Sequence, residues 1–203
     1  MAGNKHLSEK NVEKDPFLQF EKWYALRLAA VKENPNAFAL ATSSRHGDVS
    51  LRTVLLKDYG PGGFVFFTNF SSRKGNQLAE NNKAAMLFYW PELHRQVRIE
   101  GRVQKLTSEE SCHYFATRPR ESRIGAWASE QSAAIPDRQY LLDRYNHYRD
   151  EFNGQNIPLP PDWGGFRLAA LMFEFWQEGK YRLHDRIVYH PGPAGWRTSR
   201  LAP

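Results

Sequence analysis

The chain has 203 residues, a mass of 23.6 kDa, and 41% hydrophobic and 25% charged residues. These are ordinary globular proportions, and they exclude collagen-like, coiled-coil and disordered proteins. The formal net charge is +6 and the isoelectric point is about 9.5. This excess predicts an anionic partner: nucleic acid, a membrane surface or a phosphorylated small molecule.

The single cysteine and the N-terminus bear on where the protein works. Cys112 can form no intramolecular disulfide and cannot build a zinc site alone, which favours a reducing compartment. The first ten residues lack the apolar stretch of a secretory signal, and no apolar run approaches the roughly 20 residues of a spanning helix. We therefore expect a cytoplasmic protein without a membrane partner. Residues 1–14 are polar and expected to be flexible, which leaves 15–203 as a single domain.

The first half of the chain begins with a helix and continues with hairpin-spaced strands. Asp15 and Pro16 are typical of a helix start, and apolar residues recur at helical spacing to about residue 32. Residues 37–42, 49–56 and 64–68 alternate or are rich in β-branched and aromatic residues, which predicts three short strands. A short helix over 73–80 follows, and then strands over 84–89 and 96–106.

The second half inserts helices before the last strands. A capping box at Thr107 and Glu110 starts a helix to about 117, Pro119 interrupts it, and a second piece runs to about 128. Pro136 opens a third helix, residues 154–165 form a loop, and strands follow over 166–177, 182–189 and 196–201. The sum is a mostly β (α+β) fold: an antiparallel barrel of six to eight strands with flanking helices.

Two groups of residues in the first half could bind anions. Arg52 and Lys57 bracket the second strand, and their separation of five residues puts them on opposite faces of a regular strand. Either a bulge intervenes, or they serve two anions, or both simply face solvent. In the stretch 71–75, Ser-Ser-Arg-Lys-Gly, hydroxyls and cations meet free amides at a helix start, which suits a phosphate, although such stretches are common.

A third candidate anion site lies at the junction of two helical pieces. Pro119 disfavours helical geometry for Arg118, so this arginine sits between the helices, while Ser122 falls in the first turn of the next one. Together with Tyr114, they offer a phenol, a guanidinium and a hydroxyl to a phosphate. A surface arginine with local caps is an equally good explanation of the pattern.

The stretch 182–186 carries the most unusual pattern. On a strand, Arg182, His184 and Arg186 would share one face and repel each other unless an anionic or electron-rich ligand covers them. The aromatic stretch 174–177 beside them favours such a ligand, and a solvated strand face is the alternative. The sequence shows no nucleophile triad, dinucleotide fingerprint, Walker loop or zinc spacing, so we expect no metal.

These stretches together resemble the pyridoxine/pyridoxamine 5′-phosphate oxidases, FMN enzymes that make pyridoxal 5′-phosphate. The resemblance spans residues 15–203 in the order of the family. Its blocks are RTVLLK (52–57), FFTNFSSRKG (66–75), RQVRIEG (95–101), YFATRPRESRIGAWAS (114–129), QS (131–132), WGGF (163–166), EFWQ (174–177), RLHDR (182–186) and RLAP (200–203). Any one block is weak, but nine in order are highly specific.

The resemblance implies a split β-barrel homodimer with FMN at the subunit interface. It implies that the following residues contact FMN: Arg52, Thr53, Val54, Leu55, Leu56, Lys57, Phe67, Thr68, Arg73, Lys74, Gln96, Gln131, Ser132, Trp176 and Arg186. By the same resemblance, Lys57, Tyr114, Arg118 and Ser122 hold the substrate phosphate, while Arg182 and His184 lie against the substrate's pyridine ring and are the catalytic pair. Arg52 and Lys57 would then serve two phosphates.

The implied reaction oxidises pyridoxine or pyridoxamine 5′-phosphate at C4′ by hydride transfer to FMN, and dioxygen is reduced to hydrogen peroxide. Arg182 stays protonated and can hold the substrate, whereas His184 could accept a proton or only hydrogen-bond. Two departures stand out. Residues 1–14 lack the Arg-x-x-Tyr with which family members can cover the substrate, and Glu178 replaces a usual glycine after residues 174–177.

Three other functions compete with this interpretation. A phenazine-biosynthesis oxidase shares the barrel, but its substrates lack the phosphate that Tyr114, Arg118 and Ser122 would hold. A flavin- or pyridoxal-phosphate-binding protein without catalysis is a different class, and peroxide release on adding pyridoxamine phosphate would discriminate. A nucleic-acid binder is disfavoured because the basic residues form no continuous run and no recognition motif is present.

Overall fold

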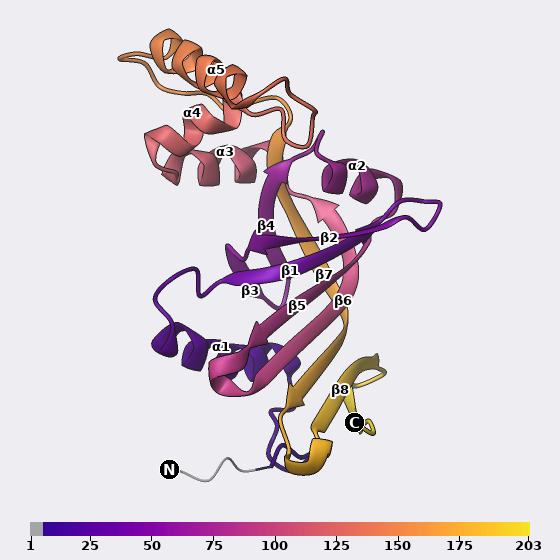
Figure 1. Ribbon diagram of the computed structural model, residues 1–203. Coiled ribbons are helices and arrows are strands. Elements are labelled where there is room, and N and C mark those ends of the chain that lie inside the picture. The colour runs from indigo at the N-terminus through magenta and orange to yellow at the C-terminus, as the bar shows by residue number, and fades with distance from the viewer. Residues whose placement is uncertain (1–5) are drawn as a thin grey trace.

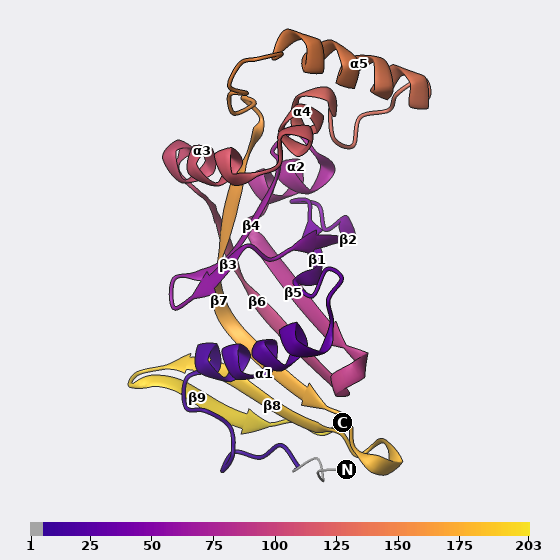
Figure 2. The ribbon, with the colours of Figure 1, turned by 90° about the vertical axis from the view of Figure 1, so that its left-hand side faces the viewer.

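One curled antiparallel sheet dominates the molecule (Figures 1 and 2). The computed structural model describes residues 6–203. The strands within this part of the chain are β1 (Ala37–Ser43), β2 (Val49–Leu55), β3 (Asp58–Gly60), β4 (Gly63–Asn69), β5 (Lys83–Trp90), β6 (Arg95–Lys105), β7 (Trp163–Gln177), β8 (Asp185–Gly192) and β9 (Gly195–Arg200). Their order is β2-β1-β5-β6-β7-β4-β3, with β8 paired to β7 and β9 to β8.

The long strand β7 is the spine of this sheet. It pairs with β6 along nearly its whole length, with β4 at its start and with β8 at its end. At about 3.3 Å per residue, its first and last side chains lie roughly 45 Å apart. The two ends of β7 therefore belong to opposite ends of the molecule, which matters for the site.

Within the described residues, five α-helices flank the sheet: α1 (Pro16–Ala30), α2 (Arg73–Glu80), α3 (Ser108–Thr117), α4 (Arg120–Ala128) and α5 (Arg138–Glu151). The expected caps are present, because Asp15 accepts from the Phe17 amide and Thr107 forms a capping box with Glu110. In both ribbon views, α3, α4 and α5 gather at one end of the sheet, near the start of β7, whereas α1 and the β8–β9 hairpin lie toward the other end. No helix among residues 6–203 is long and apolar enough to cross a membrane.

The core has two parts that match this division. The larger cluster fills the concave side of the sheet, where α1 inserts Phe20, Trp23 and Tyr24 against strand residues such as Phe88. The smaller cluster packs α3, α4 and the end of α5 around Trp163, the first residue of β7. A fixed aromatic wall thus stands where the helices meet the sheet.

The expected antiparallel, mostly β fold with flanking helices is confirmed, with three local corrections. Asp58–Gly60 is a short additional strand where none was expected, so residues 6–203 hold nine strands and not six to eight. The strand expected from residue 166 already begins at Trp163. The strand expected from 182 begins only at Asp185, because Tyr181 and Arg182 have φ of 58° and 63° and interrupt extended structure.

The N-terminal segment also differs from expectation. Residues 6–14 are not loose: Leu7 is buried, and the Tyr189 hydroxyl donates to the Glu13 carbonyl at 2.7 Å. Residues 1–5 lie outside the described part of the chain, so the expectation of flexibility is not addressed for them. The assignment of 15–203 to a single domain stays a prediction.

Candidate functional site

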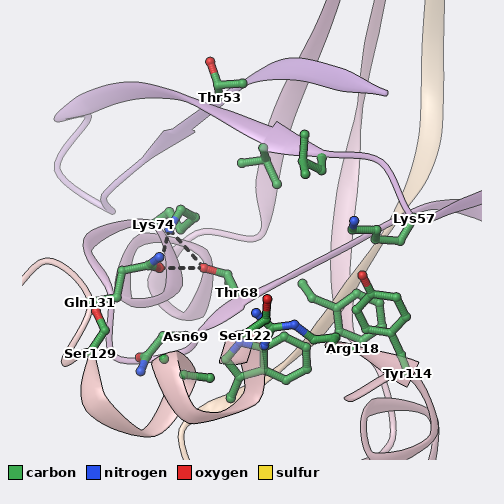
Figure 3. Close-up of a pocket in the computed structure, with 16 residues that line it drawn as sticks. Thr53, Lys57, Thr68, Asn69, Lys74, Tyr114, Arg118, Ser122, Ser129 and Gln131 are labelled. Atoms are coloured by element: carbon green, nitrogen blue, oxygen red, sulfur yellow. Dashed lines mark hydrogen bonds between the residues drawn. The ribbon is translucent and has the colours of Figure 1, made fainter. Parts of the chain in front are cut away.

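A cavity of about 500 Å³ opens where β2, β4 and α2 face α3 and α4 (Figure 3). Eleven of the residues expected to bind cofactor or substrate line it: Thr53, Val54, Leu55, Lys57, Phe67, Thr68, Lys74, Tyr114, Arg118, Ser122 and Gln131. They come from segments far apart in the sequence. The structure therefore brings together most of the residues named from the sequence.

Lys74 is a buried cation that has no acidic partner within residues 6–203. It lies in the first turn of α2, which Ser72 caps, and its ammonium donates to Thr68 Oγ1 (2.9 Å), Ser72 Oγ (3.3 Å) and Gln131 Oε1 (2.7 Å). All three acceptors are neutral. Burial, followed by the charge of Arg52, lowers the pKa of Lys74 to about 8. Such a group is stabilised by an anion at the same place.

Arg52 and Arg73 extend this positive region. The Arg52 guanidinium reaches back across the sheet to the Thr42 hydroxyl (2.6 Å) and the Leu40 carbonyl (3.2 Å). Burial and the nearby charge of Arg73 lower the pKa of Arg52. Three cations, Arg52, Arg73 and Lys74, thus lie close enough to repel one another beside the start of α2. This arrangement supports the phosphate cradle predicted from residues 71–75.

A second cationic group lines the opposite wall. Arg118 ends α3, its guanidinium lies 4.8 Å from the Trp163 ring, and burial lowers its pKa. Its buried Nη1 has no hydrogen-bond partner among the described residues. Lys57 lies 5.8 Å over the Tyr114 ring, and Ser122 is in the first turn of α4. An unpaired buried guanidinium N–H calls for an acceptor, which a bound phosphate would supply.

Arg52 and Lys57 do not lie on opposite faces of one regular strand, because β2 ends between them. Because β2 stops at Leu55, Lys57 lies beyond regular strand geometry, and its amide donates to the Val65 carbonyl of β4 at 2.9 Å. Lys57 lines the cavity, whereas Arg52 points toward β1 and α2. Leu56 does not line the cavity, because its side chain is buried in the main core. Alternation along one strand therefore does not describe this stretch.

The remaining cavity residues sit in the loop after α4. Gln131 accepts hydrogen bonds from both Lys74 and Thr68, and so bridges this loop to the cation. Ser132 has a left-handed φ of 75° and lines an adjoining polar cavity of about 630 Å³ together with Arg73. Gln131 and Ser132 carried almost no sequence signal of their own.

The other five expected residues lie at the far end of β7: Gln96, Trp176, Arg182, His184 and Arg186. Gln96 pairs with Trp176 across β6 and β7, and the Trp176 and His184 rings are 4.7 Å apart. Roughly 40 Å of strand separates Trp176 from Trp163, which borders the cavity. One chain therefore holds the two groups of residues apart.

The shared cationic face predicted for residues 182–186 is wrong. Arg182 lies in a 3₁₀ turn with left-handed φ, so it does not alternate with His184 and Arg186 along a strand. Arg186 is neutralised by Glu174, whose buried carboxylate also accepts from Arg98 at 2.6 Å. Glu174 was not predicted as the counter-ion of Arg186. It lies two residues before Trp176 on the same strand, so both side chains share one face, and this spacing could have indicated it.

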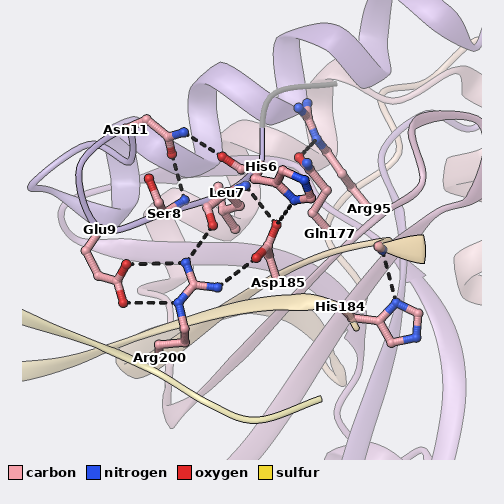
Figure 4. Close-up of polar contacts among 11 residues, drawn as sticks. His6, Leu7, Ser8, Glu9, Asn11, Arg95, Gln177, His184, Asp185 and Arg200 are labelled. Atoms are coloured by element: carbon pink, nitrogen blue, oxygen red, sulfur yellow. Dashed lines mark hydrogen bonds and ion pairs between the residues drawn. The ribbon is translucent and has the colours of Figure 1, made fainter. Parts of the chain in front are cut away.

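His184 has a defined hydrogen-bonding role. Its Nδ1 accepts a hydrogen bond from the Gly179 amide at 3.2 Å (Figure 4). A neutral imidazole with Nδ1 as acceptor carries its hydrogen on Nε2 and can donate from there. Gly179 permits this approach, since a Cβ at that position would lie 1.9 Å from the Leu183 carbonyl oxygen.

Fold and cavity together define a split β-barrel protein with a cationic cleft, whose described lining residues include no Asp or Glu. Residues 27–150 match the family model described as pyridoxamine 5′-phosphate oxidase, and residues 163–203 match that of the pyridoxine 5′-phosphate oxidase C-terminal dimerisation region. The chain belongs to the pyridoxine/pyridoxamine 5′-phosphate oxidase family. It is 52% identical to such an oxidase of Cupriavidus taiwanensis and 49% identical to one of a Nostoc species, each over 97% of this chain and at least 92% of that protein.

Solved structures agree on the fold. The structure of PhzG from Burkholderia lata 383 in complex with tetrahydrophenazine-1-carboxylic acid superposes with a TM-score of 0.90, at 30% identity and 98% coverage of both chains. An FMN-binding, pyridoxamine 5′-phosphate oxidase-related protein of Nostoc punctiforme gives a TM-score of 0.73, covering 93% of this chain and 97% of that one. At 15% identity, the second similarity concerns the fold alone.

Proposed function

We propose that the protein is an FMN-dependent oxidase that converts pyridoxine and pyridoxamine 5′-phosphate to pyridoxal 5′-phosphate, in the cytoplasm. The observation that carries the proposal is one cleft with cations on two walls: Lys74, with Arg52 and Arg73 nearby but outside the lining, on one side, and Arg118 with Lys57 on the other. Neither group has an acidic partner among the described residues. Two phosphate monoesters, one of the cofactor and one of the substrate, would satisfy both.

The residues of the cleft fit FMN by their chemistry. Lys74, the capped start of α2 and Arg52 would hold its phosphate, and Gln131 and Ser132 offer neutral polar groups to its ring. When bound, FMN supplies the two-electron acceptor that takes hydride from C4′ and passes the electrons to dioxygen, which yields hydrogen peroxide. Lys57, Tyr114, Arg118 and Ser122 would clamp the substrate phosphate and fix the position of C4′.

A homodimer with FMN at the interface would complete the site. The cavity and the 182–186 stretch are separated by most of β7, so Arg182 and His184 of one subunit would contact substrate in the cleft of the other. The match of residues 163–203 to a dimerisation region supports this assembly. Arg182 would hold the pyridine ring and stabilise developing negative charge, and His184 would donate from Nε2.

Anaerobic addition of pyridoxamine 5′-phosphate to the flavin-loaded protein tests the proposal. We expect bleaching of the flavin absorbance, and one equivalent of peroxide per turnover when air is admitted. In Arg118→Met, kcat/KM for the phosphorylated substrate should fall about 10- to 100-fold, as expected for a lost charged hydrogen bond.

Two controls belong to this experiment. Flavin content should be unchanged in Arg118→Met, and oxidation of unphosphorylated pyridoxamine should be as slow in the variant as in the wild type. Equal losses for both substrates would contradict a phosphate clamp. Flavin that binds but is never reduced would instead indicate a non-catalytic flavin-binding protein.

A phenazine-type oxidation is the second candidate, supported by the close superposition on PhzG. The ligand of that structure, tetrahydrophenazine-1-carboxylic acid, is a carboxylic acid without a phosphate group. A carboxylate could satisfy the buried, unpaired Nη1 of Arg118 as well as a phosphate could, but Lys57, Tyr114, Arg118 and Ser122 together offer more donors to the cleft than one carboxylate uses, which favours the phosphorylated substrate. Faster reduction of the flavin by a tetrahydrophenazine carboxylate than by pyridoxamine 5′-phosphate would reverse this preference.

A further inference from the structure

The Asp185 carboxylate ties the N-terminal segment to the strand that follows His184 (Figure 4). Oδ2 accepts from the Leu7 amide at 3.0 Å and lies 3.3 Å from Nδ1 of His6, and Oδ1 accepts from Arg200 Nη1 at 2.7 Å. Only 12% of the Asp185 side chain is exposed. Burial raises the pKa of Asp185, but the hydrogen bonds from Arg200, His6 and Leu7 outweigh it and leave the pKa below its usual value.

Arg200, near the end of β9, completes the connection. Its Nη2 donates to the Leu7 carbonyl at 2.8 Å, and its guanidinium forms two contacts of 3.3 Å with the Glu9 carboxylate. The peptide groups on both sides of Leu7 are therefore held, one by Asp185 and the other by Arg200. The Leu7 side chain is 5% exposed and belongs to the main core cluster. Residues 6–9 are anchored by charge, hydrogen bonds and packing together.

The loop between β7 and β8, residues 178–184, has little support of its own. Tyr181 and Arg182 both hold left-handed φ, which is costly for residues with a Cβ. Tyr181 is 91% exposed and Leu183 68% exposed. Apart from the Gly179–His184 bond, its one internal backbone bond runs from the Leu183 amide to the Lys180 carbonyl. A strained and exposed loop keeps its shape only when both ends are fixed.

We propose that residues 6–9 and Arg200 form a strap that acts through Asp185 to position Arg182 and His184 for the substrate. At the other end of the loop, the Glu178 amide donates to the His94 carbonyl at 2.9 Å, so both ends are held. Asp185 and Arg200 are then positioning residues. The part of this inference that names the substrate rests on the proposed function.

Hydrogen exchange measured by mass spectrometry on the flavin-loaded protein tests the strap without reference to activity. The variants are Asp185→Asn and a chain lacking residues 1–9. We expect amides of residues 178–184 to exchange at least tenfold faster in both, while peptides from β6 stay protected. Combining the two changes should add little, because they break the same connection.

Arg197→Gln provides the matched control. Arg197 lies on the same strand as Arg200, and its exposed side chain makes no hydrogen bond or ion pair within residues 6–203, so exchange of the loop should not change. Unchanged exchange of 178–184 in Asp185→Asn would overturn the strap. The truncated chain provides the same test if Asp185→Asn does not fold.

Turnover separates the strap from the proposed function. With flavin content unchanged, kcat/KM for pyridoxamine 5′-phosphate should fall about tenfold or more in Asp185→Asn and in the truncated chain. If the wild type does not oxidise this substrate, the proposed function is wrong, while the exchange data still decide whether the strap exists. A fall in turnover with normal loop exchange would contradict the strap.

Discussion

The charge of Lys74 depends on what the cleft contains. With a pKa of about 8, its ammonium is charged below that pH and becomes neutral above it. Because a phosphate is bound by the charged form, FMN binding should be accompanied by proton uptake above pH 8. We expect the affinity of the apoprotein for FMN to fall by up to about tenfold per pH unit between pH 8 and 10.

Calorimetry in buffers of different ionisation enthalpy measures this proton uptake. Lys74→Met should bind FMN more weakly, and its affinity should change little over the same range. A variant with the pH dependence of the wild type would show that another group titrates. Burial determines that the pKa of Lys74 is lowered and not raised, since a buried cation loses its proton more easily than an exposed one.

Single residues also show where sequence reasoning stopped. Pro119 restricts the backbone of its neighbour Arg118, and such a local effect can be predicted from the sequence. The structure confirms that Arg118 lies at the end of α3 and Ser122 in the first turn of α4. Alternation failed for Arg182 because two left-handed residues, Tyr181 and Arg182, interrupt the strand. Non-glycine residues with positive φ leave no periodic signal, so such a loop could not be predicted.

At the level of elements, α2 is fixed to the turn before it by a glycine. A Cβ on Gly75 would lie 2.1 Å from the Phe70 carbonyl oxygen, so any side chain must push the helix away. Gly75→Ala should lower the free energy of unfolding of the apoprotein by about 1–3 kcal/mol. It should also weaken FMN binding, because Lys74 and the capped helix start would move. Urea unfolding and flavin titration measure the two effects.

Gly125, in the middle of α4, is the matched control. A Cβ there meets nothing within 4 Å. Alanine is the better helix former by roughly 0.5–1 kcal/mol, so Gly125→Ala should stabilise the apoprotein by about that amount. Destabilisation by both substitutions would indicate that the contact at Phe70 is not the reason for the first.

Secondary structure was largely predictable, for identifiable reasons. The N-cap residues Asp15 and Thr107 indicated where α1 and α3 begin. The eight longer strands carried alternating or aromatic residues. The remaining strand, Asp58–Gly60, has only three residues and leads directly into a turn rich in Gly and Pro, so its sequence shows a turn pattern and no strand pattern. The pairing of β7 with three strands follows from tertiary packing, which one sequence does not display.

For the whole molecule, the separation of the two residue groups predicts complementation between subunits. Lys57→Ala damages the cleft and Arg182→Leu damages the far end of β7. In the proposed dimer, a mixed pair would hold one doubly altered site and one intact site. Unfolding and refolding the two inactive variants together should therefore restore about a quarter of wild-type activity, if subunits pair at random.

Each variant refolded alone is the control, and activity measured after mixing without unfolding shows whether subunits exchange. Flavin binding by each variant shows that it has refolded. No recovery in a refolded mixture that binds flavin would mean that both groups act within one chain.

The length of β7 has a consequence for which changes in chain length the protein can tolerate. Trp163 at its start and Trp176 near its end belong to one continuous strand, which pairs with β4, β6 and β8. Successive side chains point to opposite faces except at Leu171, where the pairing with β6 shifts and the core positions change from Phe166 and Leu168 to Phe173 and Phe175. One residue inserted or deleted elsewhere in the strand would turn over the side chains that follow it. Insertions and deletions should therefore be confined to the segments around β7, such as the loop after α5, and absent from the strand itself.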